Sequence, residues 1–366
     1  MTKNRMNSKA QAQNMFKGAN MKIAALLTAL SVATATPAMA NTDLLPGGYD
    51  AAITGAKKAM VADPAKALDL ARNAKGMLAT GQETAKKDRL IAAWLEGEAL
   101  MRLNRGGEAA GVIGFALYEA SQTHQDDKVY ADLLRSSASL KARAGDPRDA
   151  LKHFRMAQER YENLGDDRSC AIVLQNIGSL YARAGEFEQV VDHYQKAAKV
   201  FSDDGILSLS AQNNIGNALK SLGRFDEAAE NFEQALAIAK GMGSPLLEAR
   251  ILTNLASAQQ LGGDIEAADA TAGRAMALAE EHAPDWSRFV HGVAAQIELK
   301  KGNIALAGSH ISQTFEGQKL DSTDSLFREF HEAAAEIFAK GGNRELAELH
   351  TAAIERLDKQ AKTIAL

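Results

Sequence analysis

Apolar residues recur along most of the chain at the three- and four-residue spacing of amphipathic helices, and the helical stretches come in pairs around a short polar turn. Before one turn, Ile177, Leu180 and Tyr181 share a helix face, and after the next turn Phe232 and Leu236 do the same. Proline is scarce, with 6 residues, and aromatic residues make up only 5% of the chain. The pattern predicts close-packed helix–turn–helix units and argues against a β-sheet.

The pairs repeat at a fixed interval, which a glycine in each turn marks. Successive marker glycines are 38 to 40 residues apart, and two earlier units carry Asn104 and Ala62 at the marker position. A Gly or Ala stands seven residues before every marker, and an Ala stands five residues after every marker except one, where Val190 replaces it. Eight units in register predict a repeat array with one continuous core. The marker glycines are Gly145, Gly185, Gly223, Gly263, Gly302 and Gly342.

Two kinds of glycine in the units need separate explanations. The marker glycine allows the left-handed backbone that ends the first helix, where a Cβ would be strained. Gly178 and Gly216 instead lie inside a first helix, where glycine costs about 1 kcal/mol relative to alanine. We therefore expect a neighbouring helix to approach closely at these two positions.

The repeat resembles the tetratricopeptide repeat along the whole array of eight units, most strongly in units three to six. The resemblance implies an all-α fold, a right-handed superhelix of about eight helix–turn–helix units whose first helices line the concave surface. The period of about 40 residues exceeds the usual 34, which implies longer helices, as in the subclass that carries a ladder of Asn side chains. The matching residues are Gly178, Tyr181, Gly185 and Ala197, then Gly216, Gly223, Phe232 and Ala235.

The first 40 residues have the features of a signal peptide. Residues 21–40 contain Lys22, an apolar run too short to span a bilayer, and a small-residue cleavage motif that ends at Ala40. We expect translation to start effectively at Met21, cleavage between Ala40 and Asn41, and export to the periplasm, with no stable membrane insertion after cleavage. The expected layout is a signal peptide (1–40), a linker (41–48), the repeat array (49–357) and a C-terminal helix extension (358–366).

The net charge disfavours one class of partner, and the cysteine content excludes an internal disulfide. Five of the 42 basic residues and none of the 46 acidic residues lie in residues 1–40, so a chain that begins at Asn41 carries a net charge of −9. This charge disfavours nucleic acid, whose phosphates require clustered positive charge. The single cysteine, Cys170, excludes an internal disulfide, and we expect it to be a small buried residue.

Motifs of catalysis and cofactor binding are missing from the sequence. The glycine-rich stretches lack the ending of a phosphate loop, no serine stands in a nucleophile elbow, and the histidines are never closer than nine residues. We therefore expect no enzyme, no cofactor and no metal site, with His153 and His193 on a solvated helix face. The carboxylate pairs between units are expected to cap helix N-termini. These pairs are Asp126-Asp127, Asp166-Asp167 and Asp203-Asp204.

An Asn ladder provides the first candidate binding feature. Asn176, Asn214 and Asn254 each stand nine residues before a marker, although Asn is a mediocre helix former. A primary amide both donates and accepts hydrogen bonds, so the ladder could hold the backbone of an extended peptide. The alternative is that these amides bond between adjacent repeats, and both roles remain open. Further candidates on the concave face are Gln175, Asn213, Asn217, Arg250 and Thr253.

A basic side chain just before the turn provides the second feature. A cation there is favoured by the dipole of its own helix, by about 0.3–1 kcal/mol. The functional alternative is that these cations meet acidic side chains of a partner. The series consists of Arg143, Arg183, Lys220, Lys300 and Lys340.

These observations favour an exported scaffold that binds an extended segment of another protein or a peptide on the concave face of repeats three to six. The apolar stripe of residues 345–366, which includes Leu346, Leu349 and Leu357, leaves homodimerisation through the C-terminal helix open. The alternative function is a sensory module of a bacterial signalling system, similar to the arrays that precede diguanylate cyclase domains, which signals through this helix.

Overall fold

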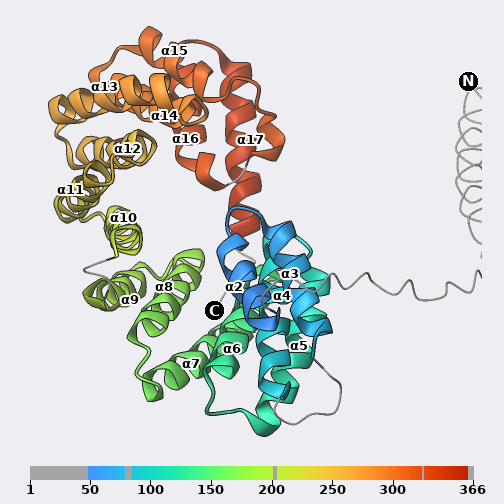
Figure 1. Cartoon of the computed structure of the whole chain (residues 1–366). Coiled ribbons are helices and arrows are strands. Elements are labelled where there is room, and N and C mark those ends of the chain that lie inside the picture. The colour runs from blue at the N-terminus through green and yellow to red at the C-terminus, as the bar shows by residue number, and fades with distance from the viewer. Residues whose placement is uncertain (1–47, 79–84, 201–203, 324, 362–366) are drawn as a thin grey trace, which may run out of the picture. The chain divides into compact units, whose positions relative to one another are not determined.

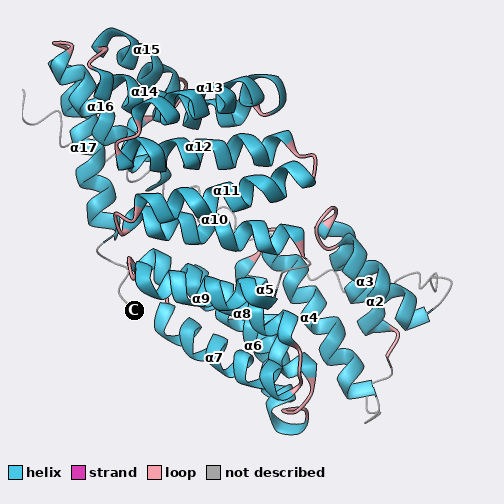
Figure 2. Ribbon diagram, turned by 90° about the vertical axis from the view of Figure 1, so that its left-hand side faces the viewer, coloured by secondary structure: helices cyan, strands magenta, loops and turns pink. Residues whose placement is uncertain are grey.

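The computed structural model describes residues 48–78, 85–200, 204–323 and 325–361. Within these residues, sixteen α-helices and two 3-10 segments follow one another without a strand (Figure 2). The predicted signal peptide lies outside the described residues. None of the helices in the described part of the chain is both long enough and apolar enough to cross a bilayer.

The helices form eight antiparallel pairs, which we number as repeats one to eight, and each pair packs against the next (Figure 1). The first helix of repeat one is α2 and its second helix is α3. The pairs are α2 (Gly48–Ala59) and α3 (Pro64–Gly76), α4 (Lys86–Arg102) and α5 (Gly106–Thr123), α6 (Lys128–Arg143) and α7 (Pro147–Asn163), α8 (Asp167–Ala184) and α9 (Phe187–Val200), α10 (Gly205–Ser221) and α11 (Phe225–Gly241), α12 (Pro245–Gly262) and α13 (Ile265–His282), α14 (Pro284–Lys301) and α15 (Ile304–Thr314), and α16 (Arg328–Lys340) and α17 (Arg344–Ala361).

Every marker glycine adopts a left-handed backbone, with φ between 74° and 94°. Asn104, which takes the marker position in repeat two, has φ 59° and is the single non-glycine with positive φ among the described residues. Asn tolerates this region better than other residues that carry a Cβ. The turn chemistry predicted from the sequence is therefore confirmed in repeats two to eight.

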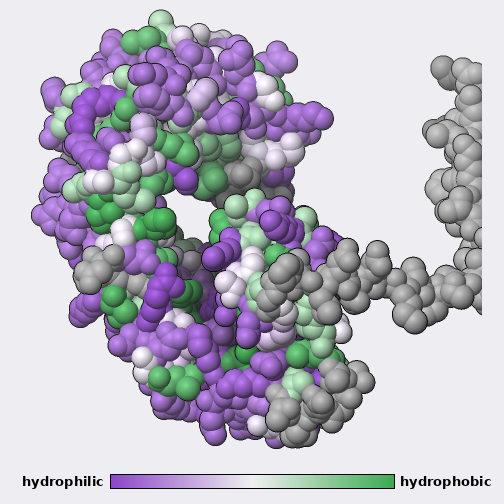
Figure 3. Space-filling view, viewed as in Figure 1, coloured by the Kyte–Doolittle hydropathy of each residue, from purple (hydrophilic) through white to green (hydrophobic). Residues whose placement is uncertain are grey.

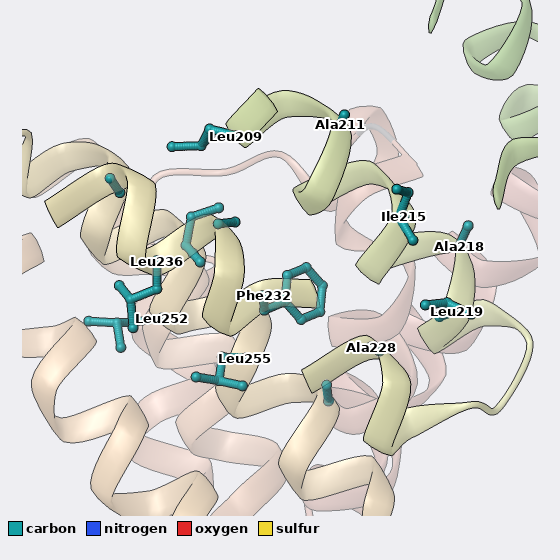
Figure 4. Packing of buried hydrophobic residues seen from close by; sticks show 14 of the residues in the cluster. Leu209, Ala211, Ile215, Ala218, Leu219, Ala228, Phe232, Leu236, Leu252 and Leu255 are labelled. Atoms are coloured by element: carbon teal, nitrogen blue, oxygen red, sulfur yellow. The ribbon is translucent and has the colours of Figure 1, made fainter. Parts of the chain in front are cut away.

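The glycines inside the first helices lie where the second helix of the same repeat comes close. A Cβ on Gly178 would stand 2.7 Å from the Tyr194 ring, and one on Gly216 would stand 2.7 Å from the Phe232 ring. Phe232 is fully buried among residues of α10, α11 and α12 (Figure 4). The expected close approach is confirmed, and an aromatic side chain of the second helix makes it.

Carboxylates cap two of the described first helices, but not all of those expected. Asp166 accepts from the backbone NH of Ser169 at 3.0 Å, and Asp204 does so from that of Leu207 at 3.2 Å. Asp127 also precedes a first helix, yet its side chain makes no capping bond. It pairs with Lys87 Nζ of the preceding repeat at 2.6 Å instead, because a charged partner satisfies the carboxylate there.

The last helix uses most of its apolar stripe within the array. α17 buries Ala353 and Leu357, whereas Leu349 remains about half exposed. Apart from Phe115 and Tyr118, which stand three residues apart on α5, the exposed large apolar side chains of the described chain are spread over several helices and turns, and the face seen in Figure 3 is mostly hydrophilic. Isolated exposed apolar residues are ordinary for a protein surface.

Candidate functional site

First helices of successive repeats lie against one another, as α4 does against α6 and α12 against α14. Second helices of adjacent repeats in the described chain do not pack to a comparable extent. A stack whose first helices are closer together bends toward them, so the first helices line its inner side (Figure 1). Among successive first helices, α8 and α10 pack least closely.

The nine residues predicted to bind a peptide all lie on the first helices of repeats four to six. They stand thirteen, ten, nine, six, three or two positions before the marker glycine, a spacing that places them on one helix face. We call the residues at these six positions of each repeat the inner stripe. The predicted binding residues are Gln175, Asn176 and Arg183 on α8, Asn213, Asn214, Asn217 and Lys220 on α10, and Arg250 and Asn254 on α12.

Part of the Asn ladder connects adjacent repeats. The side chain of Asn254 donates to Oδ1 of Asn213 at 2.8 Å, which joins α12 to α10. The side-chain Nδ2 of Asn214 instead donates to Oγ of Ser210 in its own helix, at 3.4 Å. Gln175 donates to the backbone carbonyl oxygen of Leu207 at 3.2 Å and joins α8 to α10. Asn254 thus links adjacent repeats, as the structural alternative predicted, and Gln175 does the same outside the ladder, whereas Asn214 links no repeats.

Two half-buried amides of the inner stripe have no such role. The side chains of Asn176 on α8 and Asn217 on α10 are half-buried, and within the described residues they make no hydrogen bond. Each keeps both donor hydrogens and an acceptor oxygen available. They flank the step at which successive first helices pack least closely.

Two of the basic residues before the turn cap a neighbouring helix. Arg183 donates from Nη1 to the carbonyl oxygen of Ala142 at 3.0 Å, and Arg143 donates to that of Met101 at 3.1 Å. Both acceptors lie at the C-terminal end of the first helix in the preceding repeat, where carbonyls lack helical partners. A cation there is favourable, so each arginine, which stands in the last turn of its own helix, also stabilises the preceding first helix.

Lys220 and Arg250 have different surroundings. Lys220 donates from Nζ to Ser257 Oγ at 3.2 Å and to Glu329 Oε2 at 3.3 Å. Glu329 belongs to α16, three repeats further along the chain. Arg250 lies over the ring of Trp286, 4.8 Å from its centroid, and the indole nitrogen of Trp286 donates to Thr253 Oγ1. A guanidinium on an indole face is a favourable cation–π contact.

Repeat three contains a buried polar cluster that the sequence did not single out. The Tyr161 hydroxyl donates to Asp132 Oδ1 at 2.6 Å. The indole NH of Trp94 donates to Ser136 Oγ at 3.1 Å. Burial and the Asp132 carboxylate raise the pKa of Tyr161. The cluster joins α4, α6 and α7 and satisfies its buried polar groups internally, which makes it a structural element.

Two histidine pairs also escaped the sequence prediction. His331 and His350 are buried with their Nδ1 atoms 2.7 Å apart, and the Nδ1 atoms of His291 and His310 are 2.9 Å apart. Burial lowers the pKa of both His331 and His350 to about 4. The two histidines of each pair have the same separation in sequence, and the pairs lie in successive repeats. This recurrence of histidines at the same two repeat positions could have indicated the pairs from the sequence.

The histidines that were predicted to be solvated are half-buried. His153 Nδ1 contacts Ser137 Oγ at 3.0 Å, and the His193 ring packs 5.2 Å from that of Tyr181. Both stand eight residues after a marker, the position that His310 and His350 also occupy. The prediction was wrong because this position faces the first helix of the same repeat.

Cys170 is half-buried rather than fully buried as expected. Burial and the neighbouring Glu162 raise the pKa of its thiol to about 11, which keeps it protonated and unreactive. Groups of three or more metal-ligating side chains are not found in the described part of the chain. A cavity of about 240 Å³ lies between α4 and α5, beside Leu90 and Tyr118, outside repeats three to six.

Comparisons with known proteins agree with this architecture. The family model described as tetratricopeptide repeat matches residues 130–203 and 206–281. A comparison with curated protein sequences gave no match. The solved structures that resemble the chain include RapI in its apo form, with a TM-score of 0.69, 13% sequence identity, and coverage of 87% of this chain and 99% of RapI.

Two further solved structures resemble the chain at similarly low identity. The apo quorum sensor NprR from B. thuringiensis has a TM-score of 0.61 and 14% identity, and the match covers 84% of this chain and 87% of NprR. A Rap protein complexed with competence and sporulation factor has a TM-score of 0.54 and 14% identity, with 86% and 98% of the two chains covered. Residues 130–203 and 206–281 therefore belong to tetratricopeptide repeats, and the described array around them has the solenoid fold of tetratricopeptide repeat proteins.

Proposed function

We propose that this protein is an exported scaffold that binds an extended segment of another protein on the inner side of repeats three to six. The proposal rests on one observation. The side-chain amides of Asn176 and Asn217, on the inner stripes of successive first helices, make no hydrogen bond within the described residues. An extended backbone presents alternating NH and C=O groups that such amides can bind with little regard to sequence.

The neighbouring structures support this choice of ligand class. One is a Rap protein in complex with a competence and sporulation factor, and another is a quorum sensor. Because their sequence identity to this chain is low, they show only that the folds are alike. They therefore support the proposal only in that this architecture can bind signalling ligands. The nature of the ligand rests on the inner stripe of this chain.

A photoreactive residue at Ser221 tests the proposal. Ser221 is exposed on the inner stripe of α10, so replacing it leaves the amides of Asn176 and Asn217 in place. We expect crosslinks to a partner in the exported compartment that disappear in the Asn176→Ala, Asn217→Ala double variant. A control with Gln195→Ala and Gln234→Ala removes two exposed amides from second helices and should retain the crosslinks. Crosslinks that survive the double variant would refute the role of the amides.

A sensory module is the second candidate function, and the Lys220–Glu329 contact favours it. This ion pair joins repeat five to repeat eight, so a ligand that breaks it can change how the C-terminal helices sit. Small-angle scattering measures this directly. A ligand-induced change in the radius of gyration supports a sensor, and an unchanged radius supports a rigid scaffold.

Export is the remaining part of the proposal. N-terminal sequencing of the protein recovered from the periplasm should give Asn41 as its first residue. A protein that retains residues upstream of Met21 would contradict both the cleavage and the start position.

A further inference from the structure

Charge is distributed unequally between the two sides of repeats three to six. The first helices α6, α8, α10 and α12 contain eight basic and three acidic residues. The second helices α7, α9, α11 and α13 contain eight basic and thirteen acidic residues. On the inner stripe itself these repeats carry five basic residues and one acidic residue, so their inner side is basic although the chain as a whole carries a net charge of −4. The six residues are Arg135, Arg143, Arg183, Lys220 and Arg250, and Asp132. Such a field attracts acidic groups to the inner side and repels them from the outer side.

Several cations of the inner stripe have no carboxylate partner within the described residues. Arg143 and Arg183 each use one guanidinium nitrogen for a backbone carbonyl, and Arg250 rests on the Trp286 ring. All three side chains are exposed, so their remaining NH groups face solvent. A guanidinium with free NH groups suits a carboxylate, which it can bind with two parallel hydrogen bonds.

Repeat eight has the opposite charge on the same stripe. Glu329, Glu332 and Glu336 stand thirteen, ten and six positions before the marker glycine of their repeat, which are inner-stripe positions. Glu332 pairs with Arg328 and Glu336 with Lys340 in the same helix. Glu329 instead reaches Lys220 of repeat five.

We propose that the inner side of repeats three to six selects an acidic extended segment, and that Glu329 occupies the place of one acidic side chain of that segment until the partner arrives. The proposal rests on the proposed function and specifies the chemistry of its ligand. An incoming carboxylate takes over Lys220 Nζ, and Glu329 is released to solvent.

The exposures of the two side chains suit such an exchange. The Lys220 side chain is only 13% exposed and is held by Ser257, whereas that of Glu329 is 53% exposed. Lys220 is thus a fixed receptor, and Glu329 can leave without opening the core. An ion pair of which one partner is this exposed contributes little to stability, so a ligand with several carboxylates can displace it.

Three labelled peptides of equal length test the chemistry, with alternating Asp and Ala, Lys and Ala, or Ser and Ala. Fluorescence anisotropy with the full chain should detect binding of the Asp peptide in preference to the other two, and this binding should weaken as salt is added. Equal binding of the Ser peptide, or preference for the Lys peptide, would overturn the proposal.

Charge variants test the role of Glu329. Removing the competitor with Glu329→Gln should strengthen binding of the Asp peptide by roughly two- to fivefold, whereas Lys220→Gln should weaken it by roughly tenfold or more. The matched control Glu336→Gln also removes one stripe carboxylate, but its partner is within its own helix, so affinity should stay within about twofold. Unchanged affinity in Glu329→Gln would refute the exchange.

The double variant Lys220→Glu, Glu329→Lys keeps the internal pair but reverses the receptor charge. It should fold normally and lose its preference for the Asp peptide. Crosslinking at Ser221 separates this proposal from the proposed function. A captured partner whose bound segment is neutral or basic refutes the acidic ligand and leaves the scaffold function intact. If no peptide of any charge and no partner is captured, both proposals fail.

Discussion

Repeats three to six and repeats seven to eight share one helical plan but differ in the polar side chains that they carry on the inner stripe and between paired helices. In repeats four and five, Asn176 and Asn217 have no side-chain partner within the described residues. In repeats seven and eight, two histidine pairs occupy the contact between first and second helices. At the same stripe position, six residues before the marker, repeat five carries Asn217, whose side chain has no partner among the described residues, whereas repeat eight carries Glu336, which pairs with Lys340. The residue at a given register position therefore decides whether it bonds within the array or remains available to a ligand.

We expect acid to destabilise repeats seven and eight more than repeats three to six, and this loss of stability is the largest effect that we predict. The folded state holds His331 and His350 with pKa values of about 4, below the ordinary value of 6.5. Folding therefore favours their neutral forms. Their stabilisation is fully present above about pH 6.5 and is lost as pH falls toward 4, by about 1.4 kcal/mol per pH unit for each histidine.

The surroundings of this pair strengthen the effect. One imidazolium can still donate from Nδ1 to its neutral partner, but two would direct hydrogens at each other. The Arg356 guanidinium, which donates to Thr323, lowers the pKa of His331 further. Urea unfolding followed by circular dichroism at pH 7 and pH 5 measures the loss. A variant with His331→Leu and His350→Leu should lose most of this pH dependence, and an unchanged slope would contradict the assignment.

Overpacking a first-helix glycine should be the next largest effect. Gly216→Leu places a side chain where the Phe232 ring lies, and we expect a loss of about 1–3 kcal/mol in the free energy of unfolding. Gly273→Leu is the control, because a Cβ on this helical glycine has no neighbouring atom within 4 Å. Equal stability of the two variants would show that the register of repeat five is wrong.

Replacing the residues of the Asn ladder should affect stability unequally, because only some of them make hydrogen bonds within the array. Asn254→Ala removes the bond to Asn213 and should cost about 0.5–1.5 kcal/mol. Asn176→Ala breaks no hydrogen bond and should change stability by less than about 0.5 kcal/mol. Chemical denaturation of both variants measures the difference, and a similar loss in each would mean that Asn176 also stabilises the stack.

The local features of the fold could be predicted because they repeat. A left-handed turn needs glycine or asparagine, so the marker series located the turns of repeats two to eight, including the turn at Asn104. Gly178 and Gly216 likewise indicated a close helix contact, since an unexplained glycine inside a helix is costly.

Contacts that depend on the path of the stack could not be predicted. The pairing of Lys220 with Glu329 requires the curvature accumulated over three repeats, which no local pattern encodes. The bond from Arg183 to the preceding helix depends on the offset between repeats, so neither alternative offered by the sequence, its own helix dipole or an acidic partner, included it. The histidine pairs were predictable in principle, because their recurrence in successive repeats is visible in the sequence.

The most direct test of the account is crosslinking from Ser221 on the inner stripe, compared between the parent protein and the Asn176→Ala, Asn217→Ala double variant. The account predicts a partner captured through an extended segment by the parent and lost in the double variant, with helicity and melting unchanged. A partner captured equally by both proteins would contradict the claim that these two amides form the binding site.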